Sequence, residues 1–197
     1  SMVGTSPLML FAGGTPYKNG DIKGFLKHYR ASKVPLALAN SGNGSISHLS
    51  GELFTTATGI KINAIPYRGS APALTDVAAG QVDAHFATLA SASALLGAGK
   101  ISALMVTGNT RLVSLPEVPT AREAGMESMQ FNQWWALVAP ATTPIEIVER
   151  LRNEAVAALA HPSTRERLNT LGVDLKGSTR DELRAFMRSE VDRWGAV

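Results

Sequence analysis

The residues best placed to do chemistry lie in one stretch, Asn40–Glu52, which is rich in glycine, asparagine and serine. This stretch follows an apolar run, Leu36–Ala39, that predicts a buried strand, and it leads into a helical pattern of apolar residues. Ser45 is a suitable N-cap for that helix. A strand, a turn of small residues and a helix N-terminus leave backbone N–H groups unpaired near one point. The chemistry predicted is the binding of an anion, either a carboxylate or a phosphate.

A second stretch repeats this arrangement. Residues 60–67 alternate like a strand, and the turn Arg68–Pro72 follows. Pro72 falls in the first turn of the next helix, where its missing N–H costs nothing, and Gly80 ends that helix. Two strand-to-helix turns of this kind predict a ligand held at the carboxyl ends of parallel strands.

The sequence also allows a second chemistry, that of a serine-dependent hydrolase using Ser47 or Ser70. Ser47 is next to His48, but adjacent residues of a helix do not face each other. The chain contains no G-x-S-x-G motif. The hydrolase therefore stays an alternative, and no catalytic residue is assigned.

Composition excludes several other classes of protein. The 197 residues are 45% hydrophobic and 18% charged, which predicts a packed globular protein. No cysteine is present, and the four histidines show no metal-ligand spacing, so no metal site or cofactor is expected. The net charge is only +3, and the basic residues are interspersed with acids, which argues against a nucleic-acid partner. No apolar run reaches the roughly 20 residues of a membrane span, and no signal peptide is recognised.

The elements that must position these turns alternate between strand and helix, which is typical of a mainly parallel sheet with helices on its faces. The predicted strands cover residues 8–11, 36–39, 60–67, 82–86, 101–106, 131–138 and 173–175. The predicted helices cover residues 21–30, 45–58, 71–79, 120–124 and 163–171, with a long helix before Pro162 and another at the end of the chain. Residues 88–93 are expected to form a polar turn.

The two long helices near the end of the chain each show an apolar face that predicts burial. For the first helix the face is Ile145, Val148, Leu151, Ala155 and Ala158. For the last helix it is Leu183, Phe186, Met187, Val191 and Trp194. A capping box is predicted before the last helix, formed by Thr179 with Glu182 or by Ser178 with Asp181.

The chain resembles the substrate-binding receptors of tripartite tricarboxylate transporters, the Bug or TctC family. The matching stretches are SGNGSISHLSGELF (41–54), PYRGSAPALTDVAAGQVDAHF (66–86), GAGKISALMVTGNTR (97–111), LPEVPTAREAGM (115–126), WWALVAPATTP (134–144) and the tail 148–197. Together they cover most of the chain in the order of the family, and their combination is specific.

The resemblance implies an α/β fold of the periplasmic binding protein type II kind, with two lobes and an organic acid held between them. Residues 1–106 are expected to form the second, ligand-binding lobe and residues 107–118 a crossover. Residues 119–197 are expected to form the C-terminal part of the first lobe. The leading part of the first lobe and the export signal have no counterpart here, so the chain is expected to be an N-terminally truncated receptor with its first lobe incomplete.

The resemblance also assigns the ligand-binding residues. The predicted set is Ser41, Asn43, Gly44, Ser45, Ser47, Gly69, Ser70, Ala71 and Thr88. Residues 87–91 read Ala-Thr-Leu-Ala-Ser where many relatives have an acid that meets a ligand amine, which argues against an amino-acid ligand.

The partners implied are a mono-, di- or tricarboxylate and the subunits of a membrane transporter, and the location implied is the periplasm. A monomer is expected for the full-length receptor, with a dimer as an alternative for this shorter chain. A truncated remnant that no longer binds ligand is the remaining alternative.

Overall fold

The computed structural model of the protein describes residues 1–13 and 17–195, which form two compact units. Unit 1 consists of residues 1–6 and 133–197, and unit 2 consists of residues 7–132. Each unit is described separately below.

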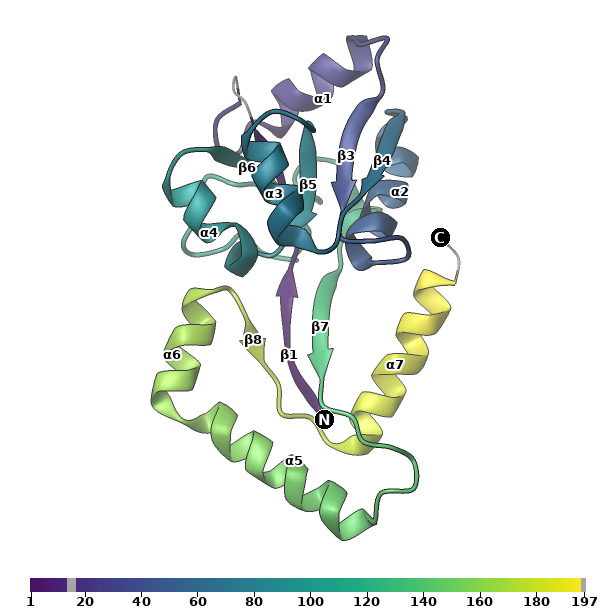
Figure 1. Cartoon of the computed structure of the whole chain (residues 1–197), viewed down its shortest axis with the longest axis vertical. Coiled ribbons are helices and arrows are strands. Elements are labelled where there is room, and N and C mark those ends of the chain that lie inside the picture. Colours follow the sequence, from purple (N-terminus) through teal and green to yellow (C-terminus); the bar gives the residue numbers. More distant parts are fainter. Residues whose placement is uncertain (14–16, 196–197) are drawn as a thin grey trace. The chain divides into compact units, whose positions relative to one another are not determined.

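Unit 2 is built on a five-stranded sheet with the order β4-β3-β5-β2-β6 (Figure 1). The strands are β2 (Met9–Gly13), β3 (Leu36–Asn40), β4 (Ile62–Pro66), β5 (Ala84–Ala87) and β6 (Ile101–Val106). β3 pairs parallel with both β4 and β5, whereas β2 pairs antiparallel with both β5 and β6. The mainly parallel sheet expected from the sequence is therefore present, with β2 as the reversed strand.

Helices cover both faces of this sheet. They are α1 (Ile22–Ala31), α2 (Ile46–Thr58), α3 (Ser70–Ala78) and α4 (Leu89–Gly97). On one face, Phe54 of α2 lies between Phe25 of α1 and Phe86 of β5, with ring centroids 6.5 and 6.0 Å apart. On the other face, buried side chains of α3 and α4, such as Leu74 and Ala92, pack with Phe11 of β2. The sheet is thus buried on both sides, as expected for parallel strands.

Helix α4 corrects one expectation, because residues 88–93 do not form a turn. Thr88 is the N-cap of α4, and its side chain accepts a hydrogen bond from the backbone N–H of Ser91. Polar residues at the start of α4 are therefore capping residues, whereas the sequence pattern alone was consistent with a loop.

The boundaries of the two units differ from those expected at residues 106 and 119. Residues 107–132 pack with unit 2, and they contain the short helix η1 (Glu127–Met129). The reason is a set of hydrogen bonds around the buried Thr107, whose hydroxyl lies 3.1 Å from the carbonyl oxygen of Leu8 and 2.8 Å from that of Phe131. Val106 also forms a parallel bridge with Thr120. The segment expected to be a crossover is thus held against the edge of the sheet.

Unit 1 contains a three-stranded sheet with the order β7-β1-β8 and three helices. Its strands are β1 (Met2–Pro7), β7 (Asn132–Ala136) and β8 (Asp174–Leu175), and its helices are α5 (Ile145–Ala160), α6 (Pro162–Thr170) and α7 (Arg180–Trp194). The sequence patterns indicate β7 and β8 but not β1, which contains glycine and proline and pairs antiparallel with β8. Glycine and proline are uncommon in strands, so β1 is recognised from its pairing with β8 and not from its own sequence.

The apolar faces expected to be buried in unit 1 are largely exposed. No residue of α5 is buried, and Ile145 and Leu151 are 51% and 46% exposed. In α7, Leu183 is buried as expected, but Met187 and Val191 are 41% and 71% exposed. The periodicity correctly predicted amphipathic helices, but it could not tell whether another element covers them.

The capping box at the start of α7 is the one formed by Thr179 and Glu182. The Thr179 hydroxyl accepts from the Glu182 backbone N–H at 3.2 Å, and the Glu182 carboxylate accepts from the Thr179 N–H at 2.8 Å. The Thr179→Ala substitution is expected to lower the free energy of unfolding of unit 1 by about 1 kcal/mol. The measurement is urea denaturation followed by tryptophan fluorescence, because Trp134, Trp135 and Trp194 all lie in unit 1. Thr179→Ser retains the hydroxyl and should unfold like the original chain; an equal loss in both variants would contradict the capping role.

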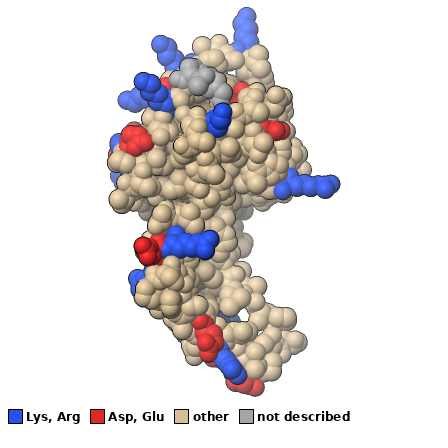
Figure 2. Space-filling model, turned by 60° about the vertical axis from the view of Figure 1, so that its left-hand side comes forward, with Lys and Arg blue, Asp and Glu red and all other residues tan. Residues whose placement is uncertain are grey.

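Two further properties concern helix hydrophobicity and surface charge. Within the described residues, no helix is long and apolar enough to cross a bilayer. Figure 2 shows Lys and Arg side chains interspersed with Asp and Glu on the face that it draws, without a continuous basic stripe.

Candidate functional site

The candidate site consists of three strand-to-helix turns in unit 2. Strands β3, β4 and β5 run parallel, and they are followed directly by α2, α3 and α4. Parallel strands end at the same edge of a sheet, so the N-termini of the three helices lie along that edge. The first two turns are in contact, because the Tyr67 N–H donates to the Asn40 carbonyl oxygen at 2.9 Å. The arrangement offers backbone donors and the positive ends of three helix dipoles.

The first turn contains five of the predicted ligand-binding residues, and three of them bond to one another. The Ser47 hydroxyl lies 2.7 Å from the Ser41 hydroxyl and 3.0 Å from the Ser45 hydroxyl, and it accepts from the Ser41 N–H. Ser45 caps α2 as expected, by accepting from the His48 N–H. Ser47 is buried, whereas Asn43 and Gly44 are exposed. The serines therefore hold the turn in shape, and the exposed Asn43–Gly44 segment faces solvent.

Some backbone N–H groups of this turn donate to other atoms of the protein. Fewer of them are therefore available to bind an anion than the sequence predicted. The Gly42 N–H donates to the Asn40 side-chain oxygen, the Gly44 N–H to His48 Nδ1 and the Ser45 N–H to the Gly42 carbonyl. In the described part of the chain, the N–H groups of Asn43, Ile46 and Ser47 have no such partner. These are the donors of this turn that remain for a ligand.

Asn40 was not among the predicted ligand-binding residues, and the structure draws attention to it. The residue is only 2% exposed, and its side-chain oxygen accepts from the Gly42 N–H at 3.0 Å. Its Nδ2 is a buried donor without a partner in the described residues. A buried amide donor without a partner is costly and calls for an explanation. Its place as the last residue of β3, directly before the turn, is the only sequence signal that could have identified it.

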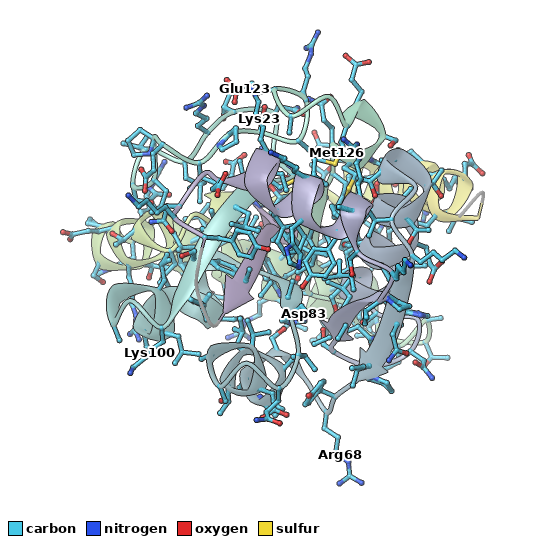
Figure 3. All side chains as sticks on the ribbon, turned by 90° about the horizontal axis from the view of Figure 1, so that it is seen from above. Lys23, Arg68, Asp83, Lys100, Glu123 and Met126 are labelled. Carbon is cyan, nitrogen blue, oxygen red and sulfur yellow. The ribbon has the colours of Figure 1, made fainter. Side chains whose placement is uncertain are left out.

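The second turn places Gly69 and Ser70 at the start of α3. Gly69 is the N-cap residue, with φ of 106° and ψ of 174°, a conformation that is essentially restricted to glycine. Because glycine has no side chain, α3 lacks the side-chain cap that Ser45 gives α2 and Thr88 gives α4. The N–H groups of Ser70 and Ala71 are therefore left without a protein partner in the described structure. Figure 3 shows the neighbouring Arg68 pointing outward from the ribbon.

Ser70 also contacts a second residue that the sequence did not single out, His85 of β5. His85 is fully buried, with Nδ1 2.9 Å from the Ala39 carbonyl oxygen and Nε2 3.1 Å from the Ser70 hydroxyl. Burial lowers the pKa of His85, and the hydrogen bond to the Ala39 carbonyl acts in the opposite direction. The β3–β5 register places His85 opposite Ala39, and no local sequence signal links His85 to Ser70, which lies 15 residues earlier.

Thr88 begins the third turn. It is 6% exposed, and its hydroxyl lies 3.0 Å from that of Ser91 while it caps α4. The structure thus places all nine predicted residues in the three turns or in the first helical residues that follow them, and the side chains of Ser45 and Thr88 both serve as helix caps.

Two other titratable residues near these strands, His48 and Asp83, have structural partners. His48 Nε2 lies 4.0 Å from Glu52, and its Nδ1 accepts from the Gly44 N–H, so it does not bond to Ser47. Asp83, labelled in Figure 3, accepts from the Ala37 N–H at 2.7 Å and thereby ties the loop before β5 to β3. Among the described residues, no group of histidine and acidic side chains is arranged to hold a metal ion.

Unit 1 contains a cavity of about 570 Å³, but its chemistry differs from that of the three turns. Its lining includes Val138, Ile145, Val148 and Leu151, which belong to or border the exposed apolar face of α5. We assign this hollow to the uncovered helix faces of unit 1, because residues of α5 and α7 form much of its lining.

Comparison with known proteins identifies the family of the chain. The family model described as "Tripartite tricarboxylate transporter family receptor" matches residues 1–197. The periplasmic binding protein BugD superposes with a TM-score of 0.91 at 31% identity, covering 98% of this chain and 65% of BugD. Rpa4515 of R. palustris, solved with adipate, gives 0.92 at 33% identity, covering 99% and 65%. MatC of Rhodopseudomonas palustris, solved with bound malate, gives 0.87 at 30% identity, covering 98% and 67%.

These matches confirm the α/β fold of periplasmic binding proteins that the resemblance implied. The chain spans only part of the proteins that it matches, for example 52% of one curated relative and 67% of MatC. Because the family model covers the whole sequence and the solved relatives share its fold, the chain belongs to the tripartite tricarboxylate transporter receptor family, which includes the Bug and TctC proteins.

Proposed function

We propose that this protein is a solute-binding receptor for a small organic acid and not an enzyme. The observation that carries the proposal is the uncapped N-terminus of α3 beside the turn of α2, where the N–H groups of Ser70 and Ala71 are available to a carboxylate. The buried donor Asn40 Nδ2 lies at the end of the strand that leads into the α2 turn. The adipate and malate named for two solved relatives are carboxylates of the class that such donors bind.

The role follows from the family. A receptor of this kind takes up its acid in the periplasm and delivers it to the membrane subunits of a tripartite transporter. We assign both the location and the partner to this chain on the basis of its family membership. Monomeric behaviour is the expected state of the complete receptor.

A serine hydrolase is the competing function, and the Ser70–His85 pair is the observation that favours it. The pair has the hydrogen bond that a nucleophile and base require. However, His85 bonds to a backbone carbonyl where hydrolases place a carboxylate, and burial lowers its pKa, so it is a poor proton acceptor. Turnover of an ester panel that disappears in Ser70→Ala would establish the hydrolase and remove the receptor proposal.

Binding of carboxylates by this chain is the direct test. A thermal-shift panel of mono-, di- and tricarboxylates should contain one class that raises the melting temperature, whereas the matched neutral amides should not. A ligand at 100 times its Kd stabilises the folded state by about 2.7 kcal/mol, which corresponds to several degrees for a chain of this size. If no carboxylate binds at millimolar concentration, the receptor proposal fails for this chain.

A further inference from the structure

The hydrogen bond between Ser70 and His85 has a defined direction. Nδ1 of His85 faces the carbonyl oxygen of Ala39 at 2.9 Å, and a carbonyl oxygen can only accept. Nδ1 must therefore carry the proton. In a neutral imidazole the other nitrogen, Nε2, is then an acceptor, so the Ser70 hydroxyl donates to it at 3.1 Å.

The surroundings keep His85 in this neutral form. The side chain is fully buried between β5 and α3, and its two ring nitrogens are matched by the carbonyl of Ala39 and the hydroxyl of Ser70. Burial without a charged partner favours the uncharged imidazole, which agrees with the lowered pKa. At neutral pH the proton of the Ser70 hydroxyl is therefore used in the hydrogen bond to Nε2 of His85.

This hydrogen bond determines which further hydrogen bonds Ser70 can form with a ligand at the proposed site. Its backbone N–H is a donor, as the carboxylate requires, but its hydroxyl oxygen can only accept a further hydrogen bond. A carboxylate oxygen next to that hydroxyl could not form a hydrogen bond with it, because both oxygens would be acceptors. A ligand that covers the hydroxyl without offering a donor leaves its oxygen desolvated and unpaired.

We propose that His85 is a positioning residue that holds the Ser70 hydroxyl as an acceptor, and that the site thereby selects 2-hydroxy acids over the corresponding acids without the hydroxyl. This inference rests on the proposed receptor function. The N and Oγ atoms of a serine are separated by the same number of bonds as a carboxylate oxygen and the 2-hydroxyl of such an acid. One ligand can therefore accept from the Ser70 N–H and donate to the Ser70 hydroxyl at the same time.

The test compares malate with succinate, which has the same carbon skeleton and two carboxylates but no hydroxyl. Isothermal titration of the chain should show malate binding about tenfold more tightly, since a site acceptor left unpaired costs about one order of magnitude in affinity. Equal affinities for the two acids would overturn the inference but leave the receptor proposal intact. Absence of binding by every carboxylate would overturn both.

Three variants test whether the preference for malate over succinate depends on the hydrogen bond between Ser70 and His85. In His85→Leu and in Ser70→Ala the ratio of the two affinities should fall to near one, because the fixed acceptor is lost. His85→Gln should restore much of the preference, since its amide oxygen can accept from Ser70. A full preference in a folded His85→Leu protein would contradict the proposal.

A spectroscopic measurement tests the direction of the hydrogen bond without any substitution. Nitrogen-15 NMR of the imidazole distinguishes the two neutral tautomers, and the His85 signal should show the proton on Nδ1 at neutral pH. A proton on Nε2, or a charged ring at pH 7, would overturn the inference even if His85→Leu fails to fold.

Discussion

Replacing Gly13 with alanine is expected to destabilise unit 2 by about 3 kcal/mol or more. A Cβ atom on Gly13 would lie 1.7 Å from the carbonyl oxygen of Val77 and 2.4 Å from its carbonyl carbon. Both atoms belong to the backbone of α3, so no side-chain rotation can relieve the clash. The end of β2 and the last turn of α3 would have to move apart, which would open the core around Phe11 and Val77.

The measurement needs a probe within unit 2, because all three tryptophans lie in unit 1. Hydrogen exchange followed by mass spectrometry should show faster exchange across β2 and α3 in Gly13→Ala. The matched control is Gly97→Ala at the end of α4, where a Cβ atom meets nothing within 4 Å. Alanine is the better helix former, so this control should be neutral or slightly stabilising. Equal protection in Gly13→Ala and the original chain would contradict the close approach of β2 and α3.

Local sequence patterns predicted the elements of unit 2 well, and the misses share a physical cause. The strands β3 and β6 and the cap at Ser45 follow from apolar runs and capping chemistry within a few residues. Residues 107–132 were harder to place, because Thr107 joins unit 2 through carbonyls of Leu8 and Phe131 that are distant in sequence. Where a contact partner is remote, a local pattern contains no information about it.

In the candidate site, too, features set by neighbouring residues were predictable, whereas features set by contacts remote in sequence were not. The two turns of small residues were visible in the sequence, because glycine and serine between a strand and a helix are typical of turns and N-caps. Asn40 lies in the first of these stretches, but its role as a donor was not predicted because it depends on burial. His85 was not singled out, because its contacts depend on burial and on the β3–β5 register. The exposed faces of α5 and α7 were predicted to be buried for a related reason: a helical period shows that a face is apolar, but not what covers it.

The Asn40→Asp substitution is expected to reduce carboxylate affinity at least tenfold. Aspartate has nearly the same shape, and its oxygen can still accept from the Gly42 N–H, which keeps the turn in place. It lacks the Nδ2 donor that has no partner in the described residues, and it adds a negative charge beside the proposed ligand site. Loss of a hydrogen bond to a charged group costs about 1.5–3 kcal/mol, and each 1.4 kcal/mol is a factor of ten in Kd.

Isothermal titration of the acid found in the thermal-shift panel measures this change. Asn63→Asp is the matched control, because Asn63 lies on the exposed edge strand β4 and gains the same charge away from the turns. It should bind the acid as the original chain does, which separates the effect of the lost donor from that of net charge. Circular dichroism of both variants checks that the sheet is intact. Unchanged affinity in a folded Asn40→Asp protein would show that the buried amide serves the turn alone, and the carboxylate would then depend on the backbone donors of α2 and α3.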